Sequence, residues 1–180
     1  MNFPNSTRQS RISSPLGEIL LAASDRGLVG VWFVEKQRHP PDSAPWRQAP
    51  DDSLLKLTAD QLRQYFGGER RNFDLPLDLT SGTDFQQAVW RALLSIGYGD
   101  TCSYGDVARA IDRPNAVRAV GLAVGRNPVS LIVPCHRVIG ANGSLTGYGG
   151  GLDRKTALLG LEGRQAQLLQ VDAGRSETPV

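Results

Sequence analysis

Short apolar stretches at the start of the chain predict a small sheet. Turn-forming residues separate them at 14–17 and 25–27, as is typical of strands joined by tight turns. Residues 53–66 instead carry apolar side chains at helical spacing and are followed by two glycines, which predicts an amphipathic helix. The strands that we predict are 9–13, 18–24, 28–34 and, after this helix, 72–77.

Helical spacing dominates the second half of the chain. Thr83 with Gln86, and Ser103 with Asp106, match the capping-box pattern that begins a helix. We expect the first of these helices to end at Gly97, because glycine is common just beyond a helix end.

A pair of short helices is expected over residues 103–126. The second of the pair should hold Pro114 in its first turn and end before Asn127 and Pro128. Beyond it, residues 131–133 predict a brief strand or a buried extended segment. A glycine-rich loop over 140–151 then leads to a last helix over 153–162.

These elements predict an α/β fold of the α+β type with two domains. Residues 1–78 should form a small N-terminal α+β domain. Residues 79–164 should form a mainly helical C-terminal domain with a helix-turn-helix. Residues 165–180 have no anchoring pattern, and we expect a mobile tail there.

The composition is that of a folded protein outside the membrane. The chain has 180 residues, of which 40% are hydrophobic, and no apolar run approaches the ~20 residues of a membrane-spanning helix. Residues 1–10 also lack the apolar region of a secretory signal. We therefore expect a cytoplasmic protein, associated with the nucleoid in a bacterium or nuclear in a eukaryote.

The net charge of +2 conceals an uneven distribution. Residues 113–152 contain no acidic side chain, yet Arg113, Arg118, Arg126 and Arg137 all lie there. One interpretation is a glycine-rich core segment that lacks charge by chance. The other is a surface that meets a polyanion such as DNA.

The second helix of the pair is built mainly from small residues. Residues 115–125 are rich in alanine, valine and glycine and offer a single long basic side chain, Arg118. This composition suits a tight helix–helix contact. It equally suits a close approach to a minor groove without reading of the base sequence.

The two cysteines, Cys102 and Cys135, form neither an expected disulfide nor a zinc-binding pattern. Cys135 lies between Pro134 and the basic residues His136 and Arg137, which favour the reactive thiolate form. A buried, inert cysteine beside a core histidine is the alternative. His136 can touch the thiol directly only if the backbone turns there; otherwise a water must bridge them.

The segment from Pro134 to Arg137, followed by Val138, Ile139 and Gly140, resembles the active-site motif of the O6-alkylguanine-DNA alkyltransferases. The likeness covers residues 83–163 closely and 9–78 loosely. Several further segments occur in the same order and spacing as in that family. They are residues 85–90, 103–105, 118–121, 127–128, 147–151 and 155–162.

The resemblance implies a repair reaction that each molecule performs once. Cys135 would accept the alkyl group irreversibly, and His136 would deprotonate its thiol through a water molecule. Glu162 would hold the imidazole, and Tyr148 would donate a proton to the departing guanine. This is the logic of nucleophile, base and orienting residue.

The resemblance also implies double-stranded DNA with alkylated guanine as partner, and a target nucleotide flipped out of the helix. Arg118 would fill the vacated space, and Tyr104 would rotate the 3′ phosphate. Asn127 would brace the helix pair against the active site, and the backbone at Val138 would read the guanine edge. Further DNA contacts are expected from Asn115, Ala119, Gly121 and Arg113, and structural support from Pro134, Arg137 and Lys155.

The family likeness further implies a ribonuclease H-like N-terminal domain and a monomer. No cofactor is implied. No metal is expected, because the N-terminal region offers His39 but no cysteine. Gly149 stands where some members have serine, and Cys102 has no family role. Whether O4-alkylthymine is repaired and whether DNA binding is cooperative stay open.

Two other functions compete with this one. A cysteine hydrolase or acyltransferase would use the same Cys135 and His136 but would turn over many times. A non-catalytic lesion sensor would bind the damaged base without reacting, and such sensors lack the acceptor cysteine that this chain has.

Overall fold

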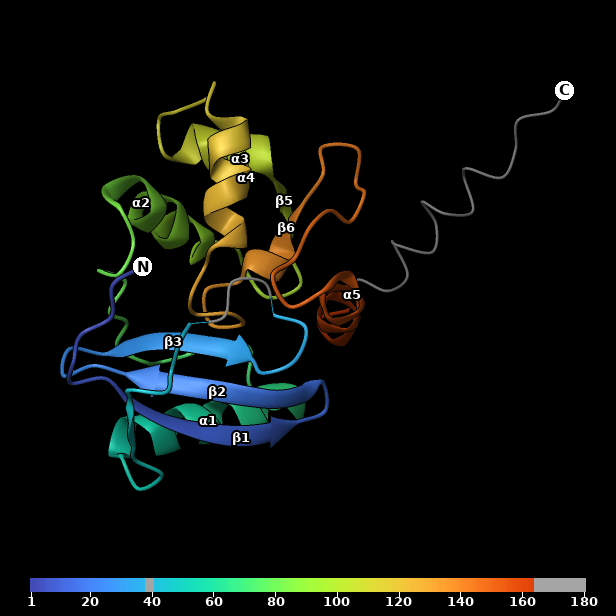
Figure 1. Ribbon diagram of the computed structural model, residues 1–180. Coiled ribbons are helices and arrows are strands. Elements are labelled where there is room, and N and C mark those ends of the chain that lie inside the picture. The colour runs from blue at the N-terminus through green and yellow to red at the C-terminus, as the bar shows by residue number, and fades with distance from the viewer. Residues whose placement is uncertain (38–40, 164–180) are drawn as a thin grey trace, which may run out of the picture.

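The first half of the chain folds as a four-stranded sheet with a helix packed on it (Figure 1). The computed structural model describes residues 1–37 and 41–163. The strand order is β3-β2-β1-β4, with β1–β2 and β2–β3 antiparallel and β4 parallel to β1. The elements are β1 (Arg8–Ser14), β2 (Gly17–Ala23), β3 (Leu28–Phe33), β4 (Arg47–Gln48) and α1 (Ser53–Phe66).

The central strand β2 is buried on both faces because its alternate side chains enter two different clusters. Ile19 and Leu21 belong to the main core, which also contains the buried side of α1. Leu20 points into a second cluster with Trp32 and Trp46. Period-two alternation thus lets one short strand join both apolar layers.

The second half is mainly helical. Its helices are α2 (Asp84–Leu93), α3 (Tyr104–Ala110), α4 (Val117–Gly125) and α5 (Leu152–Leu161). A 3-10 helix, η1 (Cys135–Arg137), leads into β6 (Val138–Ile139), which pairs in parallel with β5 (Cys102–Ser103). Trp90 of α2 is fully buried and donates its indole N–H to the carbonyl of Ala123 at 2.8 Å, which ties α2 to α4.

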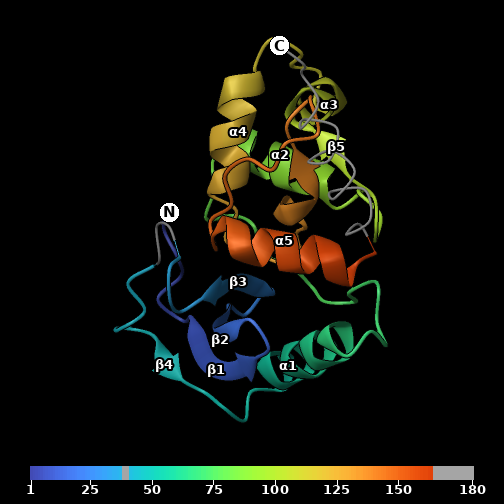
Figure 2. The ribbon, with the colours of Figure 1, turned by 90° about the vertical axis from the view of Figure 1, so that its right-hand side faces the viewer.

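Helix α5 lies between the sheet and helices α2, α3 and α4 (Figure 2). Its Arg154 donates to the carbonyls of Leu16 and Glu35, at 2.9 and 2.7 Å, and to that of Gly150 at 2.9 Å. The same guanidinium stacks 4.3 Å from the centre of the Phe33 ring. One side chain therefore joins the sheet, α5 and the glycine-rich loop.

The mixed α+β class and most predicted elements are confirmed. Both capping boxes, at Thr83 and Ser103, form as predicted. The structure also contains β4, β5, β6 and η1, which the sequence pattern did not indicate. The prediction of a mobile tail over 165–180 lies outside the described residues, and the division into domains at 78 and 79 stays a prediction.

Four predicted elements need correction. Residues 72–77 form no strand; Pro76 lacks an N–H donor, and only Leu77 forms a bridge, to Leu28. The helix that begins after Thr83 ends at Leu93 rather than Gly97. Helix α4 begins at Val117, so that Pro114 lies in the turn before it. Residues 131–133 form a buried turn instead of a strand, with φ of +74° at Leu131.

No helix among residues 1–37 and 41–163 has both the length and the apolar character needed to span a bilayer.

We expect Gly30→Ala to lower the free energy of unfolding by about 2 kcal/mol, because overpacking forces neighbours to move. A Cβ atom at Gly30 would lie 1.7 Å from the indole of Trp32, which packs against Phe3 and Trp46. Urea unfolding measures the effect. The control is Gly125→Ala in α4, where no atom lies within 4 Å and alanine favours the helix; equal stability of both variants would contradict the prediction.

Candidate active site

The backbone turns at Cys135. Residues Cys135–Arg137 form the 3-10 helix η1, in which the N–H of Arg137 donates to the carbonyl of Pro134 at 3.0 Å. The sequence left open whether the chain is turned or extended here, and the structure has the turn. Cys135 is 5% exposed, so the thiol is almost completely enclosed.

The thiol sulfur has one side-chain hydrogen-bond donor beside it. Asn127 Nδ2 lies 3.1 Å from Cys135 Sγ and 2.8 Å from the carbonyl oxygen of Val133. Its Oδ1 accepts from the N–H of Val129 at 3.0 Å. Burial raises the pKa of the Cys135 thiol, against the opposing effects of Asn127 and of the nearby Lys155 ammonium. The resting group is therefore a protonated thiol, which needs a base.

His136 is placed to act as a neutral base. Its Nε2 lies 2.9 Å from Glu162 Oε1, and because a carboxylate only accepts, Nε2 carries the proton and Nδ1 keeps a lone pair. Within the described chain, Nδ1 is a buried atom without a hydrogen-bond partner. Burial lowers the pKa of His136, and the charges of Arg137 and Lys155 lower it further.

Glu162 collects donors from several segments. Arg137 binds it through Nε to Oε2 and Nη2 to Oε1, both at 2.9 Å. Tyr65 donates its hydroxyl to Oε1 at 2.7 Å, and the N–H of Gly99 donates to Oε2 at 3.3 Å. Burial by itself raises the pKa of Glu162. The hydrogen bonds from His136 and Arg137 outweigh this effect and bring the pKa well below its usual range.

Lys155 joins the glycine-rich loop to the strand that follows Cys135. The side chain is fully buried, and Nζ donates to the carbonyls of Val138 at 2.5 Å and Thr146 at 2.8 Å. Burial lowers its pKa to about 8. A buried cation that binds two carbonyls fixes the loop and adds positive charge near the thiol.

An open hollow of about 420 Å³ lies between α4 and the glycine-rich loop. Tyr148 lines it and is buried, and its hydroxyl has no hydrogen-bond partner in the part of the chain that the structure describes. Burial raises the pKa of Tyr148 well above its usual value, so the hydroxyl stays protonated. Tyr104 lines the same hollow and accepts from Thr146 Oγ1 at 3.1 Å; Gly121 and Gly149 complete the walls.

The predicted site residues thus fall into two groups. The inner group is buried and comprises the neighbours of Cys135 and the residues bound to Glu162: Asn127, Pro134, His136, Arg137, Val138, Tyr148, Lys155 and Glu162. The outer group includes four exposed residues that lie on α4 and the turn before it: Arg113, Asn115, Arg118 and Ala119. Tyr104 and Gly121 lie between the groups, at the rim of the hollow.

Three residues of the site were missed from the sequence. Tyr65 binds Glu162, Arg154 binds the loop at Gly150, and Thr146 joins Tyr104 to Lys155. Tyr65 lies in the apolar stripe of α1 and therefore has the pattern of a core residue. No local pattern marks a hydroxyl that reaches another segment.

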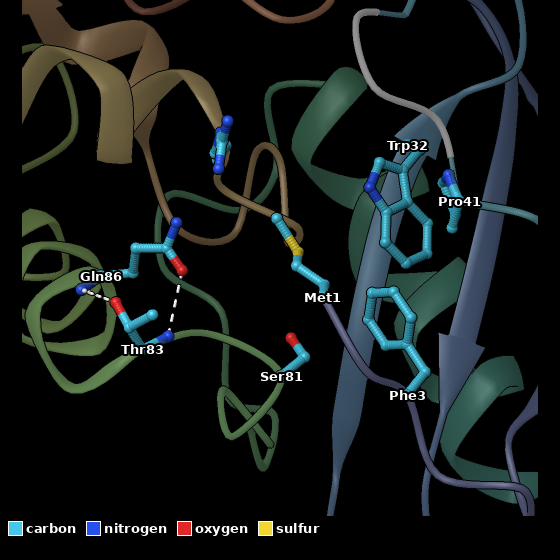
Figure 3. A pocket seen from close by; sticks show the side chains of 8 residues that line it. Met1, Phe3, Trp32, Pro41, Ser81, Thr83 and Gln86 are labelled. Atoms are coloured by element: carbon cyan, nitrogen blue, oxygen red, sulfur yellow. Dashed lines mark hydrogen bonds between the residues drawn. The ribbon is translucent and has the colours of Figure 1, made fainter.

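A second hollow, of about 530 Å³, lies between the aromatic cluster of the sheet and α2 (Figure 3). Phe3 and Trp32 face it from one side, and Thr83 and Gln86, bonded to each other, from the other. Its lining contains no cysteine, histidine or carboxylate and a single charged side chain, Arg126. Among the described residues, no three His, Cys, Asp or Glu side chains cluster to hold a metal ion.

A buried thiol, a neutral imidazole and a carboxylate, set beside a pair of short helices, define an enzyme with a cysteine nucleophile. The chain belongs to the 6-O-methylguanine DNA methyltransferase family. Residues 84–164 match the DNA binding domain of that family, and residues 8–79 match its ribonuclease-like domain. The resemblance inferred from the sequence is confirmed.

Individual relatives agree with this assignment. A methylated-DNA–protein-cysteine methyltransferase from Mycobacterium bovis is 53% identical over 155 residues, which are 86% of this chain and 92% of that protein. One from Methanosarcina acetivorans is 51% identical and covers 83% of this chain and 94% of its own. The crystal structure of Mycobacterium tuberculosis OGT in complex with DNA matches with a TM-score of 0.81 at 51% identity, covering 86% of this chain and 92% of that one.

We expect Glu162→Gln to lower the free energy of unfolding at pH 7 by about 3 kcal/mol, because it leaves the buried Arg137 guanidinium without a counter-charge. The pKa of Glu162 is lower in the folded than in the unfolded chain. Its stabilisation is therefore present above about pH 4.3, the ordinary glutamate value, and is lost as the pH falls. Urea unfolding at pH 7 and pH 3 should show the difference from wild type shrinking in acid.

Glu18→Gln is the control for this prediction. Glu18 pairs with Arg11 at the surface, where both side chains are almost half exposed, and such pairs contribute little. A Glu162→Gln penalty that is the same at both pH values would contradict the assignment of a buried ionised carboxylate.

Proposed function

We propose that this protein repairs double-stranded DNA by moving the alkyl group of O6-alkylguanine onto Cys135, once per molecule. The observation that carries the proposal is the buried thiol beside a histidine that is bound to a buried carboxylate, within the part of the chain that matches the family's DNA binding domain. The names of the relatives and the DNA complex of the mycobacterial protein support both the reaction and the partner.

The reaction balances with the groups of this chain. His136 Nδ1 takes the thiol proton through one water molecule, and Glu162 stabilises the imidazolium that forms. The thiolate sulfur attacks the alkyl carbon, the carbon–sulfur bond forms and the carbon–O6 bond breaks. Tyr148 donates a proton to the guanine that leaves and becomes a phenolate. The proton held by the His136 imidazolium then passes through water to that phenolate, so that both groups end neutral. No group in the site can hydrolyse the resulting thioether, so the protein is consumed.

The outer group of residues suits a DNA surface. Duplex DNA must release the target nucleotide before the thiol can reach it, and the exposed Arg118 can occupy the gap. Ala119 and Gly121 allow a close approach of α4, while Tyr104 turns the 3′ phosphate. Further contacts come from Asn115 and Arg113, and Asn127 links the helix pair to the thiol.

Several wider assignments are part of the same proposal. The protein acts as a monomer in the cytoplasm, or in the nucleus of a eukaryote. Residues 1–78 form the N-terminal domain and residues 79–164 the domain that binds DNA and accepts the alkyl group. Pro134 helps hold the thiol in place, and the backbone around Cys135 and Val138 reads the guanine edge.

Incubation with a duplex that contains O6-methylguanine should add the mass of one methyl group per chain, located on Cys135. Cys135→Ala should abolish the transfer, because no other group can replace the nucleophile. Intact-protein and peptide mass spectrometry measure both results.

The matched control is Cys102→Ser, which removes the other cysteine, a half-buried side chain on the strand whose backbone pairs with Val138. It should transfer as wild type does. Methyl mass on Cys102, or lesion loss in Cys135→Ala, would refute the assignment. Several equivalents of product per protein would instead support a cysteine hydrolase.

We expect Tyr148→Phe to slow methyl transfer at saturating DNA by roughly 10-fold or more, in line with the loss of a general acid. Rapid-quench single-turnover kinetics measure the rate constant. Fluorescence anisotropy measures the affinity for undamaged duplex, which should equal that of wild type. Tyr104→Phe is the comparison, since its hydroxyl faces the same hollow. If only Tyr104→Phe slowed the transfer, the proton donor would be Tyr104 rather than Tyr148.

A further inference from the structure

We propose that Tyr65, in the first half of the chain, is a positioning residue of the reaction, because its hydroxyl holds Glu162 in the orientation that His136 needs. The inference rests on the proposed function and adds a residue of the sheet-bearing half to the site. It makes that half a part of the catalytic machinery.

The geometry places three donors on one oxygen. Glu162 Oε1 accepts from Tyr65 Oη at 2.7 Å, from His136 Nε2 at 2.9 Å and from Arg137 Nη2 at 2.9 Å. Tyr65 is fully buried, and burial together with the charge of Glu162 raises its pKa. The hydroxyl therefore stays protonated at neutral pH and donates to the carboxylate.

The ring of Tyr65 cannot turn away from this position. It packs against Phe66, Phe73 and Tyr98, with ring centres 5.5, 5.4 and 6.1 Å away. Helix α1, which carries it, packs in turn on β1 and β2. The sheet thus fixes the position of α1, and α1 fixes the orientation of the hydroxyl.

Removal of the hydroxyl would have two effects on His136. Oε1 would lose one of the three donors that fix its orientation toward His136 Nε2. Oε1 would also carry more negative charge toward the imidazole and favour its protonated form. The charged and titratable groups around His136 are Arg137 and Cys135 of η1, Lys155 of α5, Glu162 at its end, and Tyr65 behind that carboxylate.

Tyr65→Phe keeps the packed ring and removes only the hydroxyl. We expect the rate constant of methyl transfer at saturating lesion duplex to fall about 10-fold at neutral pH, the lower end of the effect of one lost hydrogen bond to a charged group. The acidic limb of its pH profile should move to higher pH, because His136 is protonated more easily. The dissociation constant for undamaged duplex should be unchanged.

The matched control is Tyr98→Phe. Its hydroxyl donates to the carbonyl of Leu161 at 3.2 Å, in the same ring cluster but not on Glu162, so the rate and pH profile should be those of wild type. A wild-type profile in Tyr65→Phe, equal losses in both variants, or a loss that is the same at every pH would overturn the inference. If the wild-type protein itself transfers no methyl group, the proposed function fails instead.

Discussion

The buried carboxylate of Glu162 is the interaction on which the rest of the site depends. An unpaired charge inside a protein is costly, and its partners must be brought to it from wherever the chain can supply them. Here they come from α1, from the turn at Gly99 and from η1. The need to satisfy one negative charge therefore fixes how three distant segments meet at the end of α5.

The same burial determines the resting state of the reacting groups. Enclosure holds the thiol of Cys135 protonated and the imidazole of His136 neutral. In the proposed reaction, a neutral thiol and imidazole stay unreactive until a substrate arrives, which would protect a nucleophile that acts only once. Proton transfer would then create opposite charges, and Glu162 already binds the imidazole that would carry the positive one, so little reorganisation would remain.

The sequence predicted interactions between residues that are close in the chain and missed those between residues that are far apart in it. The capping boxes at Thr83 and Ser103 are local patterns and formed as predicted. The reactivity of Cys135 was inferred from its immediate neighbours, whereas Glu162 entered through family resemblance alone. Tyr65 could not be found, because its hydrogen bond spans 97 positions and its surroundings in the sequence look like core. The turn at Leu131 could not be predicted either, because a leucine and not a glycine has the positive φ there.

The sheet shapes the site at a second place besides Glu162. Phe33 of β3 packs so closely on the loop that a Cβ atom at Gly150 would lie 2.9 Å from its ring and 2.9 Å from Tyr148. Arg154 stacks on that phenylalanine and binds Gly150. One wall of the hollow and the carboxylate behind the base are thus both set by the first half of the chain. A division into a scaffold and a reactive domain describes the order of the chain, but the chemistry needs both halves in contact.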